Sequence, residues 1–126
     1  MIGVPVDEID WSRIDPFLRH FAARSRGMTT VEALTAEIRA KTRQVWVCGD
    51  WQAVVLTQVH TDCVTMNFCA GFGRQDWMDT VDPVLCAWAR SLGKSHVRAL
   101  ARAGWSKAAK ARGWRETHRE YTKELV

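Results

Sequence analysis

The spacing of apolar residues switches from a helical period to a strand period and back, and this switch constrains the fold more than any other feature of the chain. Apolar side chains recur every three or four residues through the first 41 positions, alternate with polar ones between residues 44 and 70, and return to helical spacing from residue 77. A chain of 126 residues has the length for one hydrophobic core. We therefore predict one α/β domain over residues 1–126.

Two helices are predicted before the sheet. Asp10 is a suitable cap for the first, in which Pro16 either bends the helix or opens its main part, and which ends near Arg26-Gly27. Thr29 and Glu32 form a capping-box pattern at the start of the second helix. The apolar stripes that define the two helices are Trp11, Ile14, Leu18, Phe21 and Ala22 in the first, and Val31, Leu34 and Ile38 in the second.

Three strands are predicted next, joined as a mostly antiparallel sheet. Gln44–Cys48 and Trp51–His60 form a hairpin around the two-residue turn Gly49-Asp50. The third strand covers Cys63–Ala70, and its side chains alternate between two faces. One face carries Val64, Met66 and Phe68, and the other carries Cys63, Thr65, Asn67 and Cys69.

A helix, a strand and a second helix are predicted after the third strand. The first helix starts at one of three aspartates, Asp76, Asp79 or Asp82, and ends at Gly93. Lys94–Ala101 has the composition of a short strand, and Gly104–Arg112 that of a short helix. The segment from Trp114 onward has helical spacing at Trp114, His118, Tyr121 and Leu125, so periodicity favours a helix there.

The sequence argues against a membrane-spanning protein and against a secreted one. No stretch approaches the roughly 20 consecutive apolar residues of a membrane-spanning helix, and Met1–Val6 lacks the basic start and apolar run of a signal peptide. We therefore expect a cytoplasmic protein without a membrane partner. The cysteines lack the spacing of a disulfide scaffold or of a zinc knuckle, so we expect reduced, packed thiols and no metal site at Cys48, Cys63, Cys69 and Cys86.

Positive charge is concentrated in the last third of the chain. Residues 90–126 carry ten Lys or Arg against three Glu, whereas the whole chain has a net charge of only +4. Clustered cations attract phosphates, and here they are interleaved with Trp105 and Trp114. A nucleic acid or a nucleotide cofactor is therefore a candidate partner, while a solvated basic face and packed tryptophans are the structural alternative.

The chain as a whole resembles the GNAT acyltransferase superfamily, and most closely the small GNAT-like proteins of tailed phages and prophages. The resemblance implies one GNAT-like domain, and it implies that the segment from Trp114 is a final strand rather than a helix. Its most specific features are Trp-Ala-Arg at the end of the long helix and Arg-Ala-Gly-Trp before the short one. The segments that carry it are Val4–Leu18, Gln44–Val59, Cys86–Glu116 with Gly113-Trp114, and Thr122–Leu125.

What the resemblance implies chemically is binding of acetyl-CoA or another acyl-CoA. The pantetheine arm would lie against the third strand, and the pyrophosphate would bind backbone N–H groups where the long helix begins. A helix N-terminus suits that role because its first N–H groups are unpaired and carry partial positive charge. The residues so implicated are Phe68, Cys69, Gly71, Phe72, Gly73, Arg74 and Gln75.

Two positions depart from the family's pattern. The glycines that normally follow the Arg or Gln of the pyrophosphate loop are replaced by Trp77, Met78 and Thr80. The tyrosine that usually protonates the leaving thiolate falls on Ala109, which has no proton to donate. For the base that deprotonates an amine, the candidates at strand ends are His60, Asp62, His96 and the acidic residues after Gln75, of which we select His96 and Asp62.

Two functions therefore remain open. In the first, the chain binds acyl-CoA and transfers an acetyl group to a small amine. In the second, it is a non-catalytic GNAT-like module, a phage structural, assembly or host-interaction protein that binds protein or nucleic acid. The two differ in the loop between the third strand and the long helix, which is open to a cofactor in the enzyme and filled by Phe72 or Trp77 in the module.

Overall fold

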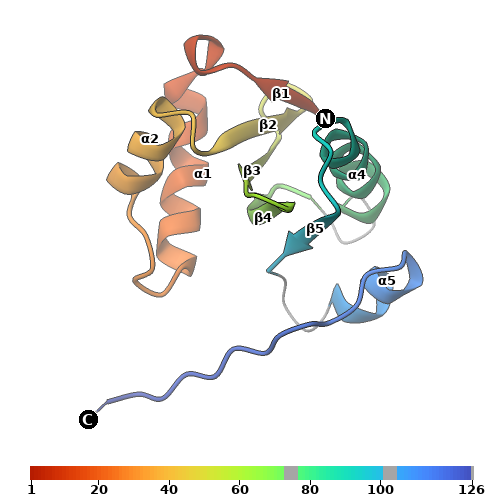
Figure 1. The fold of residues 1–126 in the computed structure, drawn as a ribbon. Helices are drawn as coiled ribbons and strands as arrows, with labels where there is room; N and C mark the ends of the chain where they lie inside the picture. The colour runs from red at the N-terminus through yellow and green to blue at the C-terminus, as the bar shows by residue number, and fades with distance from the viewer. Residues whose placement is uncertain (73–76, 101–104, 126) are drawn as a thin grey trace.

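A five-stranded sheet with helices on both faces makes up the structure, a computed structural model (Figure 1). It describes residues 1–72, 77–100 and 105–125, apart from the side chains of residues 77 and 78. The strands lie in the order in which they occur along the chain: β1 (Ile2–Val4), β2 (Gln44–Cys48), β3 (Ala53–Val59), β4 (Cys63–Ala70) and β5 (His96–Ala99). The first four strands pair antiparallel, and only β4 and β5 pair in parallel.

Helices α1 (Trp11–Arg24) and α2 (Val31–Arg39) cover one face of the sheet (Figure 1). A 3₁₀ turn, η1 (Val6–Glu8), joins β1 to α1, and the side chain of Asp10 caps α1 by accepting from the Arg13 amide. The apolar stripes of both helices pack on alternate residues of β2 and β3. This α1-side core consists of Ile9, Ile14, Leu18, Phe21, Leu34, Ile38, Val45, Val47, Val54 and Leu56.

The opposite face is covered by α4 (Asp82–Ser91) and α5 (Ser106–Ala111). A π-helical turn, η2 (Trp77–Val81), precedes α4, and Pro83 lies in the first turn of α4, where its missing N–H removes no helical hydrogen bond. The buried residues of this α4-side core are Val55, Met66, Val81 and Leu85. Several tryptophans surround it as partly buried packing residues: Trp46, Trp88, Trp105 and Trp114.

The predicted fold class is confirmed: an α/β domain with two N-terminal helices and a mostly antiparallel sheet, followed by a helix, a strand and a second helix. Several local predictions were wrong by a short distance, among them the hairpin loop and the cap of α2. The hairpin loop spans Gly49–Gln52 rather than two residues, because both Gly49 and Trp51 have positive φ and β3 starts only at Ala53. The cap of α2 is Thr30, whose hydroxyl accepts from the Ala33 amide, and not Thr29.

The alternation predicted for Cys63–Ala70 is broken by a β-bulge. Leu56 pairs with Phe68 and Thr57 with Met66, so Asn67 is an extra residue in β4. A bulge shifts every later side chain to the other face. Phe68 consequently contacts the ring of Phe21 on the α1 side, at 5.2 Å between centroids, instead of sharing a face with Met66.

The C-terminal segment forms neither the helix that its spacing favoured nor the final strand that the resemblance implied. After α5, residues 114–125 run as an extended tail with no helix or strand (Figure 1). Only its first residue is anchored: the Trp114 amide donates to the Ala109 carbonyl, and its indole N–H donates to Asp82 Oδ1 at 2.6 Å. Beyond Trp114 every residue of the described tail is exposed.

Candidate functional site

Strand β4 continues past the point where its pairing with β5 ends. The parallel register runs from Cys63 opposite His96 to Met66 opposite Ala99, and a last bond joins the Leu100 amide to the Met66 carbonyl at 3.4 Å. β4 extends on to Ala70, paired on its other side with β3. Among the residues that the structure describes, no strand pairs with this side of Asn67–Ala70, which we call the open edge of β4.

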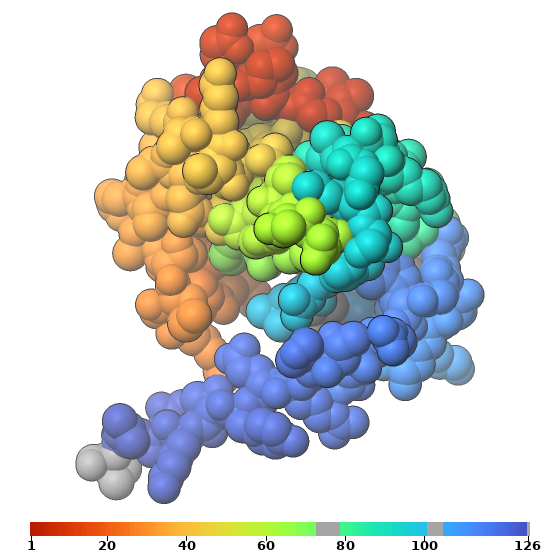
Figure 2. Space-filling view, viewed as in Figure 1, coloured from red at the N-terminus to blue at the C-terminus, as the bar shows by residue number. Residues whose placement is uncertain are grey.

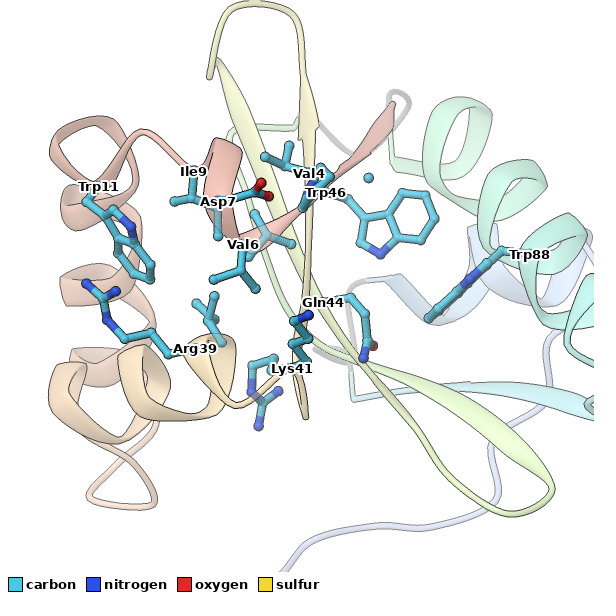
Figure 3. A pocket seen from close by; sticks show the side chains of 15 residues that line it. Val4, Val6, Asp7, Ile9, Trp11, Arg39, Lys41, Gln44, Trp46 and Trp88 are labelled. Atoms are coloured by element: carbon cyan, nitrogen blue, oxygen red, sulfur yellow. The ribbon is translucent and has the colours of Figure 1, made fainter.

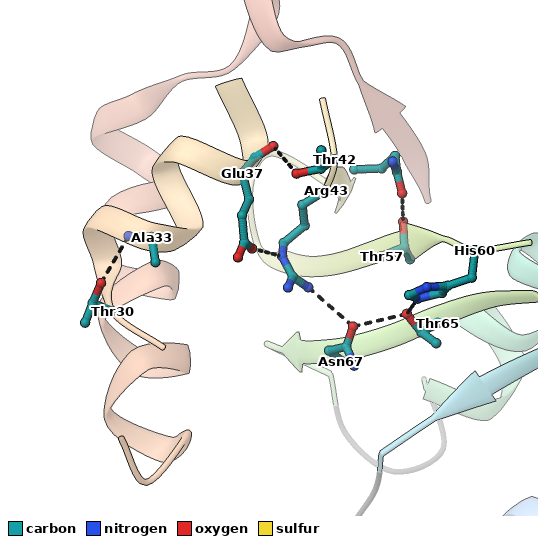
Figure 4. A network of polar contacts seen from close by, with 10 residues as sticks. Thr30, Ala33, Glu37, Thr42, Arg43, Thr57, His60, Thr65 and Asn67 are labelled. Carbon is teal, nitrogen blue, oxygen red and sulfur yellow. Dashed lines mark hydrogen bonds and ion pairs between the residues drawn. The ribbon is translucent and has the colours of Figure 1, made fainter. Parts of the chain in front are cut away.

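A buried arginine holds the bulge from which the open edge begins (Figure 4). Arg43, at the start of β2, is only 8% exposed; its Nε donates to Glu37 Oε2 at 2.6 Å and its Nη1 donates to Asn67 Oδ1 at 3.3 Å. The guanidinium also lies 5.3 Å from the ring centroid of Phe68. One side chain therefore links α2, the start of β2 and the bulged residue of β4, and contacts the first two residues of the open edge, Asn67 and Phe68.

The polar network of Arg43 continues along β4, and a separate set of buried hydrogen bonds surrounds Thr57 on the other face of the sheet. Thr65 donates its hydroxyl to Asn67 Oδ1 at 3.2 Å, and a ring nitrogen of His60 lies 2.9 Å from the same hydroxyl (Figure 4). On the α4 side, the Thr57 hydroxyl, fully buried, accepts from the Trp46 indole and donates to Gln44, both at 3.0 Å. No buried side-chain nitrogen or oxygen in the described part of the chain lacks a hydrogen-bond partner.

Gly71, predicted to bind a cofactor, has a packing role in the structure. Its φ is +94°, and a Cβ placed there would lie 2.4 Å from the Gln52 carbonyl oxygen and 2.7 Å from the Ala53 Cα. Glycine is therefore required for the end of β4 to approach the start of β3. Of the other predicted loop residues, Phe72 packs against the α4-side core, while Gly73, Arg74 and Gln75 lie outside the described residues.

The resemblance implicates Phe68 and Cys69 in cofactor binding, and both lie on the open edge, but on opposite faces of the sheet. Phe68 packs on the α1-side core and Cys69 on the α4-side core. Burial raises the pKa of the Cys69 thiol to about 12, so the thiol stays protonated and is a poor nucleophile. The four cysteines are free thiols in the structure, and Cys63 is the buried one.

The raised pKa of Cys69 predicts a loss of stability at alkaline pH. The unfolded thiol ionises near its ordinary pKa of 9.0 and the folded one only near about 12, so stability is full below pH 9 and falls as pH rises between these values. The expected loss is up to about 1.4 kcal/mol per pH unit. Urea unfolding at pH 8, 9 and 10 should therefore show a steeper decline for the wild type than for Cys69→Ala, and parallel declines would contradict the burial argument.

The predicted bases His96 and Asp62 lie together, but at the far end of the β4–β5 pair. His96 opens β5 opposite Cys63, and its Nδ1 lies 2.7 Å from the Ser95 hydroxyl, which itself donates to the Asp62 carbonyl oxygen at 3.0 Å. Both candidate side chains are exposed. Three residues of strand, roughly 10 Å, separate His96 from the pairing of Met66 with Ala99, where the open edge begins.

Helix α5 and its flanking tryptophans cover the α4-side core with apolar side chains. Trp105, Ala108, Ala109 and Trp114 all pack on the α4-side core, so these two tryptophans serve as packing residues. An ion pair between Arg112 and Asp79, and the bond from Trp114 to Asp82, join α5 and the tail to the start of α4. Ala109, which the resemblance sets at the position of the proton donor, packs among apolar residues of the α4-side core.

A cavity that the sequence analysis did not anticipate lies at the other edge of the sheet (Figure 3). Its volume is about 930 Å³, and it is bordered by β1, η1, the end of α2, the start of β2 and Trp88. Arg39 stacks over Trp11 at 4.3 Å, and Trp46 meets Trp88 edge-on with ring centroids 5.0 Å apart. The lining comes from three segments far apart in sequence, so no local motif marks it.

Two further searches of the described residues gave negative findings. No group of three or more His, Cys, Asp or Glu side chains there could hold a metal ion. None of the helices in that part of the chain combines the length and the apolar character needed to cross a membrane.

Comparison with known proteins identifies the fold. No family model and no curated protein matches the sequence. Among solved structures, a probable acetyltransferase is similar with a TM-score of 0.68 at 13% identity, over 99% of this chain and 97% of its own. The ribosomal-protein-alanine N-acetyltransferase of Brucella melitensis biovar Abortus 2308 also gives 0.68, at 10% identity over 98% of both chains. A Bacillus halodurans protein gives 0.64 at 11% identity, over 99% of this chain and 100% of its own. The chain thus has the fold of GNAT-type acetyltransferases.

Proposed function

We propose that this chain binds acyl-CoA along the open edge of β4 and transfers the acyl group to a small amine. The observation that carries the proposal is the end of the β4–β5 pairing at Met66, four residues before β4 itself ends at Ala70. A strand edge without a partner offers backbone N–H and C=O groups in a row. The two amides of a pantetheine arm have the chemistry to bind such an edge as a short extra strand would.

The residues around the open edge suit that arm. Cys69, Ala99 and Ala109 present small, partly buried side chains on the α4 side. On the α1 side, Asn67 is held by Arg43 and Thr65. Acyl-CoA would supply the thioester: the amine nitrogen forms the amide bond to its carbonyl carbon, the C–S bond breaks, and CoA leaves as the thiol with the proton that the amine loses. Asn67, held in place at the start of the open edge, would contact the bound arm.

Calorimetric titration with acetyl-CoA tests the binding step. We expect a micromolar Kd and a higher melting temperature, because a ligand that binds only the folded state stabilises it by about 2.7 kcal/mol at one hundred times its Kd. Gly73→Asp should weaken binding at least tenfold, since the resemblance sets this residue beside the pyrophosphate, where a carboxylate repels it. Gly27→Asp, which adds the same charge between α1 and α2, is the matched control and should bind normally.

A second candidate function is favoured by two observations. Phe72 packs on the α4-side core, and Ala109 has no proton to donate. Both suit a GNAT-like module that binds protein or nucleic acid, as a phage assembly or host-interaction protein would, without catalysis. Release of free CoA from acetyl-CoA in the presence of a panel of small amines distinguishes the two functions. Turnover supports the transferase, and binding without turnover supports the module. A calorimetric titration that shows no binding heat at 1 mM acetyl-CoA overturns the acyl-CoA site itself.

A further inference from the structure

The cavity between β1 and the end of α2 takes no part in the proposed acyl transfer. It has a volume of about 930 Å³, and in the sheet β3 lies between β2, which borders the cavity, and the open edge of β4. In the space-filling view, the red N-terminal segment and the golden end of α2, which both border the cavity, lie next to each other at the surface (Figure 2). A cavity of several hundred Å³ with mainly apolar walls and a few charged groups is typical of a site for a small molecule.

Aromatic and aliphatic side chains form most of the cavity's walls. Trp46 and Trp88 meet edge-on, and both are only half-buried, so part of each ring is available to a ligand. Flat aromatic groups pack favourably on such rings. The other large apolar residues of the lining are Val4, Val6, Ile9, Trp11, Ile38 and Val45. These walls suit a ligand with a flat, apolar body.

Two cations of the lining, Arg39 and Lys41, have no ion-pair partner among the described residues. The Arg39 guanidinium lies over the ring of Trp11, with its central carbon 4.3 Å from the ring centroid. This contact uses the face of the guanidinium, so its N–H groups can still donate to an anion. Figure 3 shows Arg39 and Lys41 at the end of α2, across the cavity from Trp88 on α4.

The other charged groups of the lining leave these two cations in excess. Arg43 already pairs with Glu37, so its charge is offset. Asp7 is the only carboxylate among the described lining residues, and it is exposed to solvent, which weakens its effect on a bound anion. The cavity therefore complements a ligand that carries a negative charge.

The backbone of Lys41 has a conformation that is costly for a lysine. Its φ is +63°, and it follows α2 in a Schellman motif: the Lys41 amide donates to the Ile38 carbonyl and the Thr42 amide to the Glu37 carbonyl, both at 3.0 Å. Glycine is the usual residue at this position, because a Cβ is strained there. Backbone strain is often found at binding sites. Here the strained residue carries one of the two cations of the cavity.

We propose that the cavity binds an aromatic carboxylate. The carboxylate is held by Arg39 and Lys41, and the flat body of the ligand packs against the tryptophan side of the lining. A guanidinium and a carboxylate form two parallel hydrogen bonds, which makes arginine well suited to this ligand. The inference does not depend on the acyl-CoA site.

Calorimetric titration with 2-naphthoate, and with its neutral amide 2-naphthamide, tests the requirement for charge on one aromatic body. We expect a sub-millimolar Kd for 2-naphthoate and binding at least about tenfold weaker for 2-naphthamide, which cannot form a charge-assisted pair. Nuclear magnetic resonance spectra locate the ligand. Among the seven tryptophans of the chain, the indole N–H signals of Trp11, Trp46 and Trp88 should shift most on addition of 2-naphthoate.

Lys41→Gly separates ligand binding from the stability of the fold. It should weaken 2-naphthoate binding about tenfold by removing a cation, yet raise the urea midpoint by relieving the strain at positive φ. Arg26→Gly is the matched control: Arg26 follows α1 with a φ of +55°, is exposed and does not line the cavity. This control should gain stability in the same way and keep the wild-type affinity for 2-naphthoate.

Two further variants test the charges without changing the backbone. Arg39→Gln should weaken 2-naphthoate binding about as much as Lys41→Gly, because it removes the other cation. Asp7→Asn should instead strengthen binding about twofold, because it removes the one carboxylate of the described lining.

Four results would overturn the inference. The first is an absence of binding heat at millimolar 2-naphthoate, and the second is a set of indole shifts confined to tryptophans outside the cavity. The third is equal affinity for 2-naphthoate and 2-naphthamide, since the cations would then have no role. The fourth is wild-type affinity in both Lys41→Gly and Arg39→Gln.

Discussion

Gly71→Ala is expected to lower the free energy of unfolding by about 3 kcal/mol or more. The new methyl group would lie 2.4 Å from the Gln52 carbonyl oxygen, and Ala would have to adopt a φ of +94°. The two nearest clashing atoms, the Gln52 carbonyl oxygen and the Ala53 Cα, belong to the backbone of a neighbouring segment, so no side-chain rotation relieves the clash. The start of β3 and the end of β4 would have to separate, which disrupts the pairing of Val54 with Ala70.

Urea unfolding measures the loss of unfolding free energy. Substitutions at two other glycines distinguish the steric clash from the backbone strain at positive φ. Gly93 and Gly113 also have positive φ, +71° and +87°, but a Cβ at either would have no heavy atom within 4 Å. Gly93→Ala and Gly113→Ala should therefore cost only the backbone strain, about 1 kcal/mol each. A Gly71→Ala variant as stable as these two controls would show that the close approach to Gln52 is absent in solution.

Arg43→Leu is expected to cost about 2–3 kcal/mol. The substitution leaves Glu37 without its ion-pair partner and Asn67 Oδ1 without one of its two donors. Arg43 is 8% exposed, so water cannot replace the guanidinium without opening the interface between α2 and the sheet. Glu37 is 35% exposed and can recover part of its hydration, which limits the loss.

An exposed ion pair gives the matched control for Arg43. Arg13 pairs with Asp50, but the two side chains are 47% and 78% exposed, so Arg13→Leu should change stability by less than about 1 kcal/mol. Arg43→Lys should fall between the two, because an ammonium group keeps the charge but cannot bridge Glu37 and Asn67 in the same planar geometry. Equal urea midpoints for Arg43→Leu and Arg13→Leu would contradict the role of the buried network.

Arg43→Leu also connects stability to the proposed site. The guanidinium holds Asn67, and the bulge at Asn67 is where the open edge of β4 begins. If acetyl-CoA binds there, its affinity should fall in Arg43→Leu under conditions where the variant is still folded, while Arg13→Leu should keep the wild-type affinity.

Local sequence patterns correctly predicted much of the fold. β2 and β4 have the predicted bounds, and α4 begins at Asp82, one of the three predicted starts. α1 has the predicted cap at Asp10 and continues through Pro16. These features depend on side-chain periodicity, on caps and on the special geometry of proline and glycine, all of which act over a few residues.

The tertiary structure alone decided the features that combine distant segments. The bulged residue Asn67 accepts a hydrogen bond from Arg43, 24 residues away, and no alternation pattern within β4 reveals the bulge. The tight approach at Gly71 involves the backbone of Gln52, and the cavity near Trp46 and Trp88 is assembled from three separate segments. The extended tail likewise contradicts its own helical spacing. The sequence by itself thus determined the periodic elements, whose hydrogen bonds and apolar faces are local, whereas the site geometry followed from packing between elements, which no short stretch of sequence encodes.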